Sequence, residues 1–306
     1  MLSAERSLAE LWLATDGVAV ANLVVKNPGV AAALLPSTSK ARDEVNDGDD
    51  DDVSDEVLHK LIAKIRRDKH RTLSHGREVS ASEREAREET LVAVLVALGQ
   101  LLPQIGYCQG MNMVAGYALA MHNFDAERGL WTTWAVLRRG GGLYAPGMPG
   151  FDAGMAWLAT AIPTVLPAVA AAMAAADVVP LMFASAWLHT LMSHDSLPAH
   201  VTRATWTAMA SAELPPQACA AAGATGSRPH VVVVLAAALA LLACLEPALG
   251  PAAVDTMAFL SVFRDDELIK TMVEPAAFAR AFAPAVDFLF ADQAALTQLI
   301  SAFAAP

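Results

Sequence analysis

Apolar residues recur along most of the chain at the spacing that places them on one face of a helix, and the alternation typical of strands is hard to find. In the first half such runs cover residues 4–25, 58–65, 91–102, 113–121 and 125–138, and the charged segment 82–89 is expected to open the helix that continues through 91–102. In the second half they cover about 151–162, 163–176, 180–193, 198–212, 231–245 and 260–290. The pattern therefore predicts an all-α fold.

Glycine and proline interrupt this pattern at two places. Residues 139–142 read R-G-G-G, which should end a helix, so two helical halves are expected to meet near residues 140–150. Pro103 and Gly106 separate two of the apolar runs. They predict a helix that stops near Leu102 and a new helix that starts at about Tyr107.

A helix that starts at Tyr107 would place Gln109 and Asn112 one turn apart, at i and i+3 on a shared face. Two interpretations are open at this point. The two amides can be satisfied inside a capped core helix, as buried polar groups usually are. Alternatively, Gln109 can be held out towards a ligand, because the adjacent Gly110 leaves the backbone free to turn.

Composition narrows the class of protein. The 306 residues are 55% hydrophobic and 17% charged, which is enough for one or two domains with a sizeable core. The net charge of −11 argues against nucleic acid as a partner, since phosphate contacts need clustered Lys and Arg. The three cysteines, Cys108, Cys219 and Cys244, suit neither a disulfide framework nor a zinc site, which indicates a reducing compartment.

The segment 43–56 is an acidic run with almost no apolar residues. Such a segment cannot bury enough surface to fold, so a solvated, disordered loop is expected. A calcium loop counted from Asp43 would place its glycine correctly at Gly48. However, Val45 and Ser54 would then occupy positions that need an oxygen ligand and the closing glutamate, so this alternative fails.

Two apolar runs raise the possibility of a membrane span. Residues 155–176 are uncharged and long enough to cross a bilayer, but they contain Pro163 and Pro167 and many alanines. Residues 231–245 are apolar but short. Charged residues within 1–36 argue against a signal peptide. Helices buried in an all-α domain explain these runs better, so no transmembrane span is expected.

A charged pair extends the apolar stripe formed by Leu58, Leu61, Ile62 and Ile65. Further steps of three residues reach Asp68 and then Arg71, on the packed side of the helix as it ends. The two side chains can form a local ion pair worth a few tenths of a kcal/mol. The functional interpretation is that Asp68 positions an otherwise mobile Arg71 at the domain surface.

Two motifs together resemble the catalytic signatures of the TBC domain, the family of GTPase-activating proteins for Rab-type small GTPases. The first is I-x-x-D-x-x-R, with Ile65, Asp68 and Arg71; the second is Y-x-Q within the longer Y-C-Q-G-M-N of residues 107–112. Their order and separation also resemble the family's pattern. The resemblance covers roughly residues 12–291 and is sharpest over 65–152.

Some positions depart from the family pattern. Only residues 6–12 hint at the G-I-P-x-x-L-R-x-x-x-W segment with which TBC domains usually begin. Trp187 lies in a segment resembling the family's S-Q-W-x-x-x-L-F helix and is expected to anchor the core, although Ala186 replaces the usual glutamine. Residues 213–230 match poorly, where the family has a short connection.

The resemblance implies a V-shaped helical domain that acts on a GTP-bound Rab-family GTPase. Arg71 would stabilise the charge of the transition state, and Gln109 would orient the attacking water. Tyr107 and Asn112 would support the Gln109 backbone, and Ile65, Asp68 and Gly110 would complete the site. The partner would carry the GTP and Mg²⁺, so the chain would need no cofactor or metal. The location would be cytoplasmic, with peripheral association to endomembranes through the partner during vesicle trafficking.

Pattern and resemblance together divide the chain into four segments. Residues 1–42 would form the N-terminal helical edge of the domain, and residues 43–56 the acidic loop. Residues 57–150 would form the catalytic subdomain with both fingers, and residues 151–306 the C-terminal helical subdomain.

Three rival functions are weighed against GTPase activation. The first is a catalytically inactive TBC protein that binds a Rab or scaffolds a complex, although the presence of both Arg71 and Gln109 counts against it. The second is a membrane-embedded helical protein, supported only by the long apolar runs. The third is nucleophilic catalysis at Cys108, which lacks a recognisable base at a defined spacing.

Overall fold

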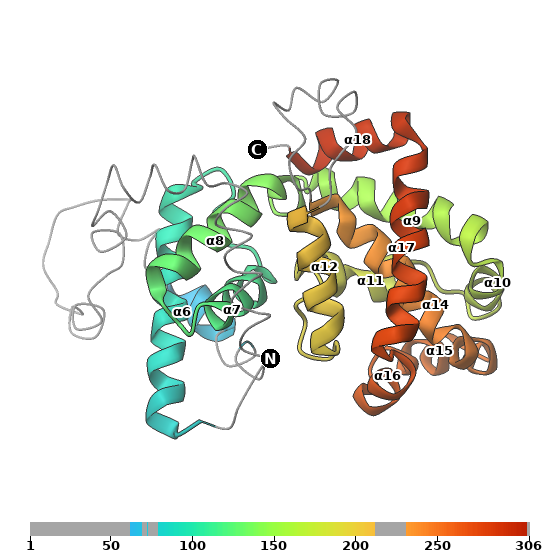
Figure 1. The fold of residues 1–306 in the computed structure, drawn as a ribbon, viewed down its shortest axis with the longest axis horizontal. Helices are drawn as coiled ribbons and strands as arrows, with labels where there is room; N and C mark the ends of the chain where they lie inside the picture. Colours follow the sequence, from blue (N-terminus) through green and yellow to red (C-terminus); the bar gives the residue numbers. More distant parts are fainter. Residues whose placement is uncertain (1–61, 69–71, 73–78, 212–230, 305–306) are drawn as a thin grey trace, which may run out of the picture. The chain divides into compact units, whose positions relative to one another are not determined.

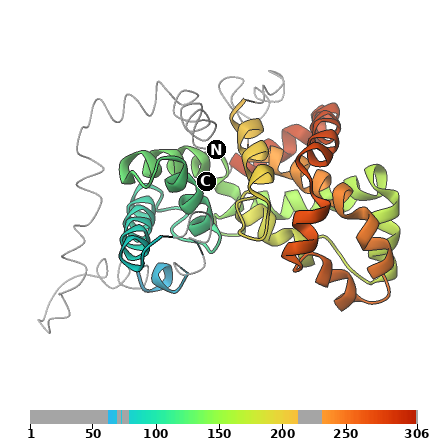
Figure 2. The same ribbon diagram turned by 60° about the horizontal axis from the view of Figure 1, so that its bottom comes forward.

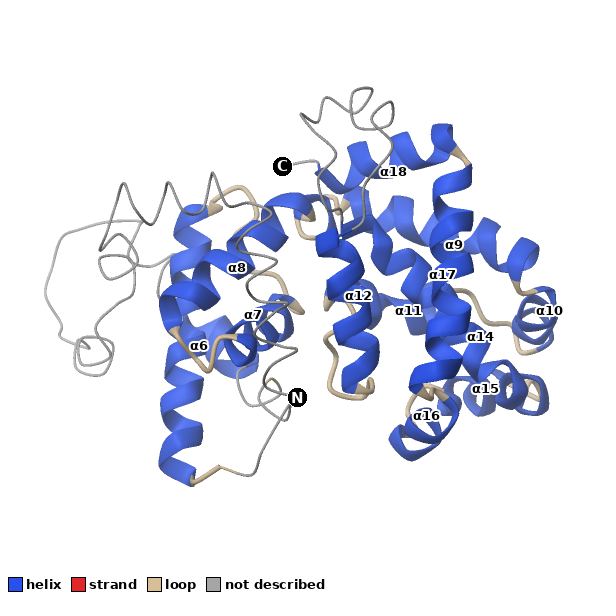
Figure 3. Cartoon of the chain, viewed as in Figure 1, coloured by secondary structure: helices blue, strands red, loops and turns tan. Residues whose placement is uncertain are grey.

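The computed structural model describes residues 62–68, 72, 79–211 and 231–304. Within these residues every regular element is a helix and none is a strand (Figure 3), so the predicted all-α fold is confirmed. The chain divides into two compact units, residues 1–138 (unit 1) and 139–306 (unit 2). The expectations for 4–25, for the acidic run 43–56 and for 213–230 fall outside the described residues.

Unit 1 is built on α6 (Ala81–Leu101), with α7 (Met111–Met121) packed beside it and α8 (Ala126–Arg139) closing the unit (Figure 1). Residues 62–68 form a further helix. The side chain of Ser80 caps α6 by accepting a hydrogen bond from Glu83 N at 3.2 Å, which satisfies an otherwise unpaired amide. As predicted from Pro103 and Gly106, α6 ends at Leu101.

The predicted start of the next helix at Tyr107 is wrong. Helix α7 begins at Met111, and its N-cap is Gly110. The φ of Gly110 is 105°, a backbone conformation that glycine adopts readily and that is strained for other residues. Residues 102–110 form turns and irregular backbone instead. Gln109 and Asn112 therefore do not share a helix face: Gln109 is exposed on the loop, and Asn112 is buried in the first turn of α7.

The core of unit 1 is aliphatic. Its fully buried side chains include Ile65, Leu91, Leu95, Leu98, Met111, Leu119 and Leu130. In α8 the two tryptophans differ, because Trp131 is buried whereas Trp134 is partly exposed under Arg138, whose guanidinium carbon lies 5.0 Å from the ring centroid. The expectation that these aromatics belong to the core holds for Trp131.

Unit 2 consists of helices arranged around a central one, α14 (Val234–Ala252). The others are η2 (Gly141–Leu143), α9 (Pro149–Val165), α10 (Pro167–Ala175), α11 (Leu181–His189), α12 (Ala199–Ser211), η3 (Val231–Val233), α15 (Thr256–Val262), α16 (Asp266–Met272), α17 (Pro275–Ala291) and α18 (Gln293–Ala304). Helix α14 packs against α17, α10 and α15, and these helices gather together in both views (Figure 1, Figure 2).

The run of valines at 231–234 enters this core as helix, as predicted. Each of the residues 231–242 is at most 1% exposed, so the burial of these side chains offsets the modest helix propensity of valine. Trp187 is also buried, as expected of a core anchor, and the ring centroids of Trp187 and Phe263 lie 5.5 Å apart. Helix α11 is thus joined by aromatic contacts to the residue that ends α15.

Among the described residues, the segment Val231–Ala252 is long and apolar enough to cross a membrane, with a mean hydropathy of 2.4. Its most apolar stretch is 72% buried within the protein, which fits a core helix. The other apolar run, residues 155–176, is not one straight helix, because the chain bends by 114° between α9 and α10. Two separate helices were predicted here, and two are found. Leu166 and Pro167 stand at that bend.

Candidate functional site

The two motifs meet through a hydrogen bond between Asp68 and Tyr107 in unit 1. The Tyr107 hydroxyl donates to Asp68 Oδ2 at 2.8 Å, across 39 positions of sequence. Ile65, one turn before Asp68, is fully buried and fixes the helix 62–68 in the core. Tyr107 is 7% exposed. The sequence motifs are therefore two sides of one contact, which sequence spacing alone did not show.

Burial raises the pKa of the Tyr107 hydroxyl well above its usual range, and the hydrogen bond to the Asp68 carboxylate raises it further. The phenol therefore keeps its proton and remains a donor throughout the physiological range. A protonated phenol that donates to a carboxylate forms a charge-assisted bond, which is stronger than a bond between neutral groups. This contact holds the end of the helix 62–68 against the loop that carries Gln109.

Asn112 makes a second link between the motifs. Its Nδ2 donates to Thr72 Oγ1 at 2.7 Å, and its Oδ1 accepts from the backbone N–H of Gly110 at 3.0 Å. Thr72 Oγ1 in turn donates to the Asp68 carbonyl at 3.1 Å. Asn112 and Thr72 are 3% and 1% exposed. The amide of Asn112 is thus satisfied, and it joins the backbone beside Gln109 to the residue that follows Arg71 in sequence.

Lys64 supplies a third link. Its Nζ donates to the Tyr107 carbonyl at 2.9 Å and lies 5.5 Å from the centroid of the Tyr107 ring. Neither Lys64 nor Thr72 was predicted from the sequence. Thr72 directly follows the first motif and could have been found there, whereas no local pattern distinguishes Lys64 from any other exposed lysine.

Gln109 is exposed at the centre of the loop. Tyr107 and Gly110 on either side of it are buried, and Cys108 is half-buried with its N–H donating to Met111 Sδ at 3.2 Å. The loop is therefore anchored at both ends while the Gln109 side chain faces solvent. Arg71 lies outside the described residues, although Asp68 and Thr72, which precede and follow it, are both held by the contacts above.

Cys108 is poorly suited to nucleophilic catalysis. Burial raises the pKa of its thiol, although Lys64 acts in the opposite direction. A thiol with a raised pKa holds little thiolate at neutral pH, and the thiolate is the reactive form. The geometry thus gives no support to the third rival function.

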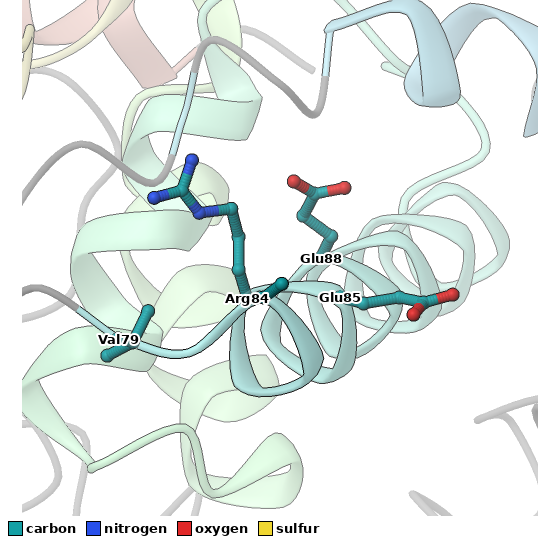
Figure 4. Close-up of a pocket in the computed structure, with 5 residues that line it drawn as sticks. Val79, Arg84, Glu85 and Glu88 are labelled. Atoms are coloured by element: carbon teal, nitrogen blue, oxygen red, sulfur yellow. The ribbon is translucent and has the colours of Figure 1, made fainter.

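A separate hollow of about 390 Å³ lies at the start of α6 (Figure 4). It is lined by Val79, Ala81, Arg84, Glu85 and Glu88, and none of these belongs to the two motifs. Across the described ranges no group of three His, Cys, Asp or Glu side chains is placed to hold a metal ion.

Comparison with known proteins points to one family. The Rab-GTPase-TBC domain matches residues 34–221. Growth hormone-regulated TBC protein 1 of Xenopus laevis is 30% identical over 148 residues, covering 48% of this chain and 43% of that protein. The human protein of the same name is 31% identical over 199 residues, covering 65% and 53% respectively. The chain thus spans about half the length of these relatives.

A solved structure shares the fold. The Chlamydomonas flagellar RabGAP TBC domain superposes with a TM-score of 0.63 at 21% identity, and the match covers 90% of this chain and 78% of that one. Because the domain match extends over more than half of the chain, and because both motifs lie inside it, the chain belongs to the Rab-GTPase-TBC domain family.

Proposed function

We propose that this protein is a GTPase-activating protein for a Rab-family GTPase in its GTP-bound form. The observation that carries the proposal is the state of Gln109, an exposed amide on a loop between two buried residues: Tyr107 is hydrogen-bonded to Asp68 of the other motif, and Gly110 to Asn112. An exposed side chain on an anchored loop is suited to contact a partner rather than to fill the core.

Small GTPases hydrolyse GTP slowly because charge develops on the transferring phosphoryl group and the attacking water is poorly held. A planar, permanently charged arginine addresses the first difficulty. Glutamine addresses the second, since its amide both accepts a hydrogen bond from water and donates one to a phosphate oxygen. In this proposal Arg71 and Gln109 play these two roles in trans, and Gln109 replaces the GTPase's own glutamine.

The contacts around Gln109 lower the cost of reaching the reactive geometry. Tyr107 is held by Asp68 through its hydroxyl and by Lys64 through its carbonyl. Gly110 is held by Asn112. A side chain on a pre-positioned backbone loses less freedom when it engages the transition state. GTP and Mg²⁺ would belong to the partner, so the chain would need no cofactor or metal of its own.

We also infer a cytoplasmic location, with contact to endomembranes through the bound Rab, because prenylated GTPases would present the chain to the membrane surface. The alternative function is that of an inactive TBC protein that binds a Rab without accelerating hydrolysis. Both functions use the same surface, so only an activity measurement separates them.

The test is phosphate release from a panel of GTP-loaded Rab proteins, each with and without the chain. The best substrate is then assayed with Arg71→Ala and Gln109→Ala. Arg264→Ala and Gln298→Ala are the matched controls, because both side chains are exposed and lie outside the motifs. Loss of stimulation is expected in the first pair alone. Binding of a Rab without any stimulated release would establish the inactive binding protein instead.

A further inference from the structure

We propose that Gly116 is a positioning residue for the arginine motif, acting through the side chain of Thr72. This inference rests on the proposed GTPase-activating function. Gly116 lies in α7, within the buried face that supports the site. Gly116 lies outside both sequence motifs.

The contact is an unusually close approach. A Cβ atom built on Gly116 would lie 2.6 Å from Thr72 Cγ2, and its next neighbours would be the Thr72 carbonyl at 3.4 Å and Cβ at 4.0 Å. Ordinary contacts between carbons are about 3.5–4.0 Å. The absence of a side chain at Gly116 therefore creates the space that the Thr72 methyl occupies, whereas the rest of Thr72 already lies at an ordinary distance.

Thr72 cannot avoid a methyl at position 116 by rotating its side chain. Its Oγ1 accepts from Asn112 Nδ2 at 2.7 Å and donates to the Asp68 carbonyl at 3.1 Å. Any rotation that moves Cγ2 also moves Oγ1, because both atoms are attached to the same Cβ. Thr72 is also 1% exposed, so no open space is available for the methyl.

A side chain at position 116 should disturb the contacts that join the two motifs. If Thr72 moves, Asn112 Nδ2 loses its 2.7 Å hydrogen bond to Thr72 Oγ1 and keeps only the longer one, of 3.4 Å, to the Asp68 carbonyl. The same Asn112 side chain holds the Gly110 N–H beside Gln109. Thr72 directly follows Arg71 in sequence. A displacement at Thr72 is therefore expected to change the placement of Arg71 relative to Gln109.

The experiment compares Gly116→Ala with the double variant Thr72→Ser/Gly116→Ala. Serine keeps the hydroxyl and removes only the methyl, so the nearest remaining Thr72 atom is the carbonyl at 3.4 Å. Gly250→Ala is the matched control, since Gly250 also lies in a helix and a Cβ added to it would meet nothing within 4 Å. All chains are assayed for stimulated hydrolysis on the best Rab, together with Arg71→Ala.

Gly116→Ala is expected to lower kcat on the order of 10²-fold, the range for a misplaced catalytic group, with KM nearly unchanged. The double variant is expected to recover to within about threefold of Thr72→Ser alone, because the two changes are coupled. In the NMR spectrum of the Gly116→Ala protein, the side-chain amide protons of Asn112 should exchange with water faster than in the wild type. Gly250→Ala should match the wild type in every measurement.

Three outcomes overturn the inference. They are full kcat in Gly116→Ala, failure of Thr72→Ser to restore activity to Gly116→Ala, and an unchanged Asn112 amide in Gly116→Ala. Failure of the proposed function gives a different result, since Arg71→Ala would then be as active as the wild type. The amide exchange of Asn112 tests the contact even in that case.

Discussion

Asp68 and Tyr107 are joined by a bond of 2.8 Å in which a buried phenol donates to a half-buried carboxylate. The pair brings together two segments that are 39 residues apart in sequence, and Gln109 lies two residues beyond Tyr107. The position of the loop should therefore depend on the Tyr107 hydroxyl, which is bonded to Asp68.

Tyr107→Phe removes this hydroxyl and leaves the ring in place. A hydrogen bond to a charged group contributes about 1–2 kcal/mol when the carboxylate is partly hydrated, so the free energy of unfolding should fall by that amount. Stimulated hydrolysis should fall about tenfold through kcat, because the loop loses one of its anchors. Urea unfolding and single-turnover phosphate release measure the two effects.

The control for this variant is Tyr144→Phe in unit 2, where the hydroxyl donates to the His189 carbonyl at 2.9 Å. It should show a comparable loss of stability without loss of stimulated hydrolysis. Equal loss of activity in both variants would mean that Tyr107 acts only through general stability.

Arg71→Ala should reduce stimulated hydrolysis by about 10³-fold or more, the range seen when an arginine supplied in trans is lost. Gln109→Ala should also reduce it severely, with no loss of stability, because the side chain is exposed. The two losses should not add, since both groups act on one transition state. Phosphate release measured for both single variants and for the double variant checks this.

A related measurement uses the GTPase. If Gln109 acts in trans, replacing the GTPase's own catalytic glutamine by leucine should weaken hydrolysis less than it does with an activator that provides only an arginine. Full activity of Arg71→Ala at wild-type stability would contradict the two-residue mechanism.

Lys64→Met tests the third anchor of the loop. Methionine keeps most of the apolar stem but cannot donate to the Tyr107 carbonyl, which is now held at 2.9 Å. Because Lys64 is exposed, the free energy of unfolding should change by less than about 1 kcal/mol. The kcat of stimulated hydrolysis should fall severalfold, and the Gln109 amide should become more mobile by NMR relaxation.

Lys270→Met is the matched control for Lys64→Met, since Lys270 is an exposed lysine that bonds Glu267 Oε1 at 2.8 Å. It should leave hydrolysis unchanged. A Lys64→Met protein with wild-type kcat would show that Tyr107 is fixed without the lysine.

His122 should make stability depend on pH. Burial lowers the pKa of His122 to about 4, with a smaller contribution from Arg128, and its Nε2 lies 2.8 Å from Thr132 Oγ1. The unfolded chain has the ordinary value of about 6.5, so it binds the proton first as the pH falls. Stability is therefore unaffected above pH 6.5 and decreases as the pH falls from about 6.5 towards 4.

The decrease attributable to His122 reaches at most about 3 kcal/mol at the low end. Urea unfolding at pH 7 and pH 5 measures it, and the His122 ring proton in NMR should not titrate above pH 5. Because burial also lowers the pKa of His189 and His200, a His122→Gln protein should lose part of the slope rather than all of it. A ring proton that titrates near 6.5 would refute the assignment to His122.

Most of the helices could be predicted from the sequence because their signals are local. The apolar spacing before Leu102, followed by Pro103, located the end of α6. The start of α7 was missed because it depends on Gly110 at a φ of 105°, and glycine in a sequence does not reveal which region of backbone space it occupies.

The site was predictable as a set of residue types but not as a set of contacts. The residues of the two motifs indicated Asp68, Tyr107 and Asn112 as site residues, and these three do lie together in unit 1. Their partners were not predictable, since the contacts of Asn112 with Thr72 and of Lys64 with Tyr107 join residues 40 and 43 positions apart. Such contacts are set by packing, which a local pattern does not encode.

The burial of helix α14 should determine how fast the amide hydrogens of unit 2 exchange with solvent. Each side chain over residues 231–242 is at most 1% exposed, and neighbouring helices cover it. Its amide hydrogens should therefore exchange with deuterated water only through global unfolding of unit 2, whereas the seven-residue helices α15 and α16 should exchange through local fraying. Pro247 and Pro251 interrupt the hydrogen-bond ladder towards the end of α14, so the slowest amides should end before Pro247.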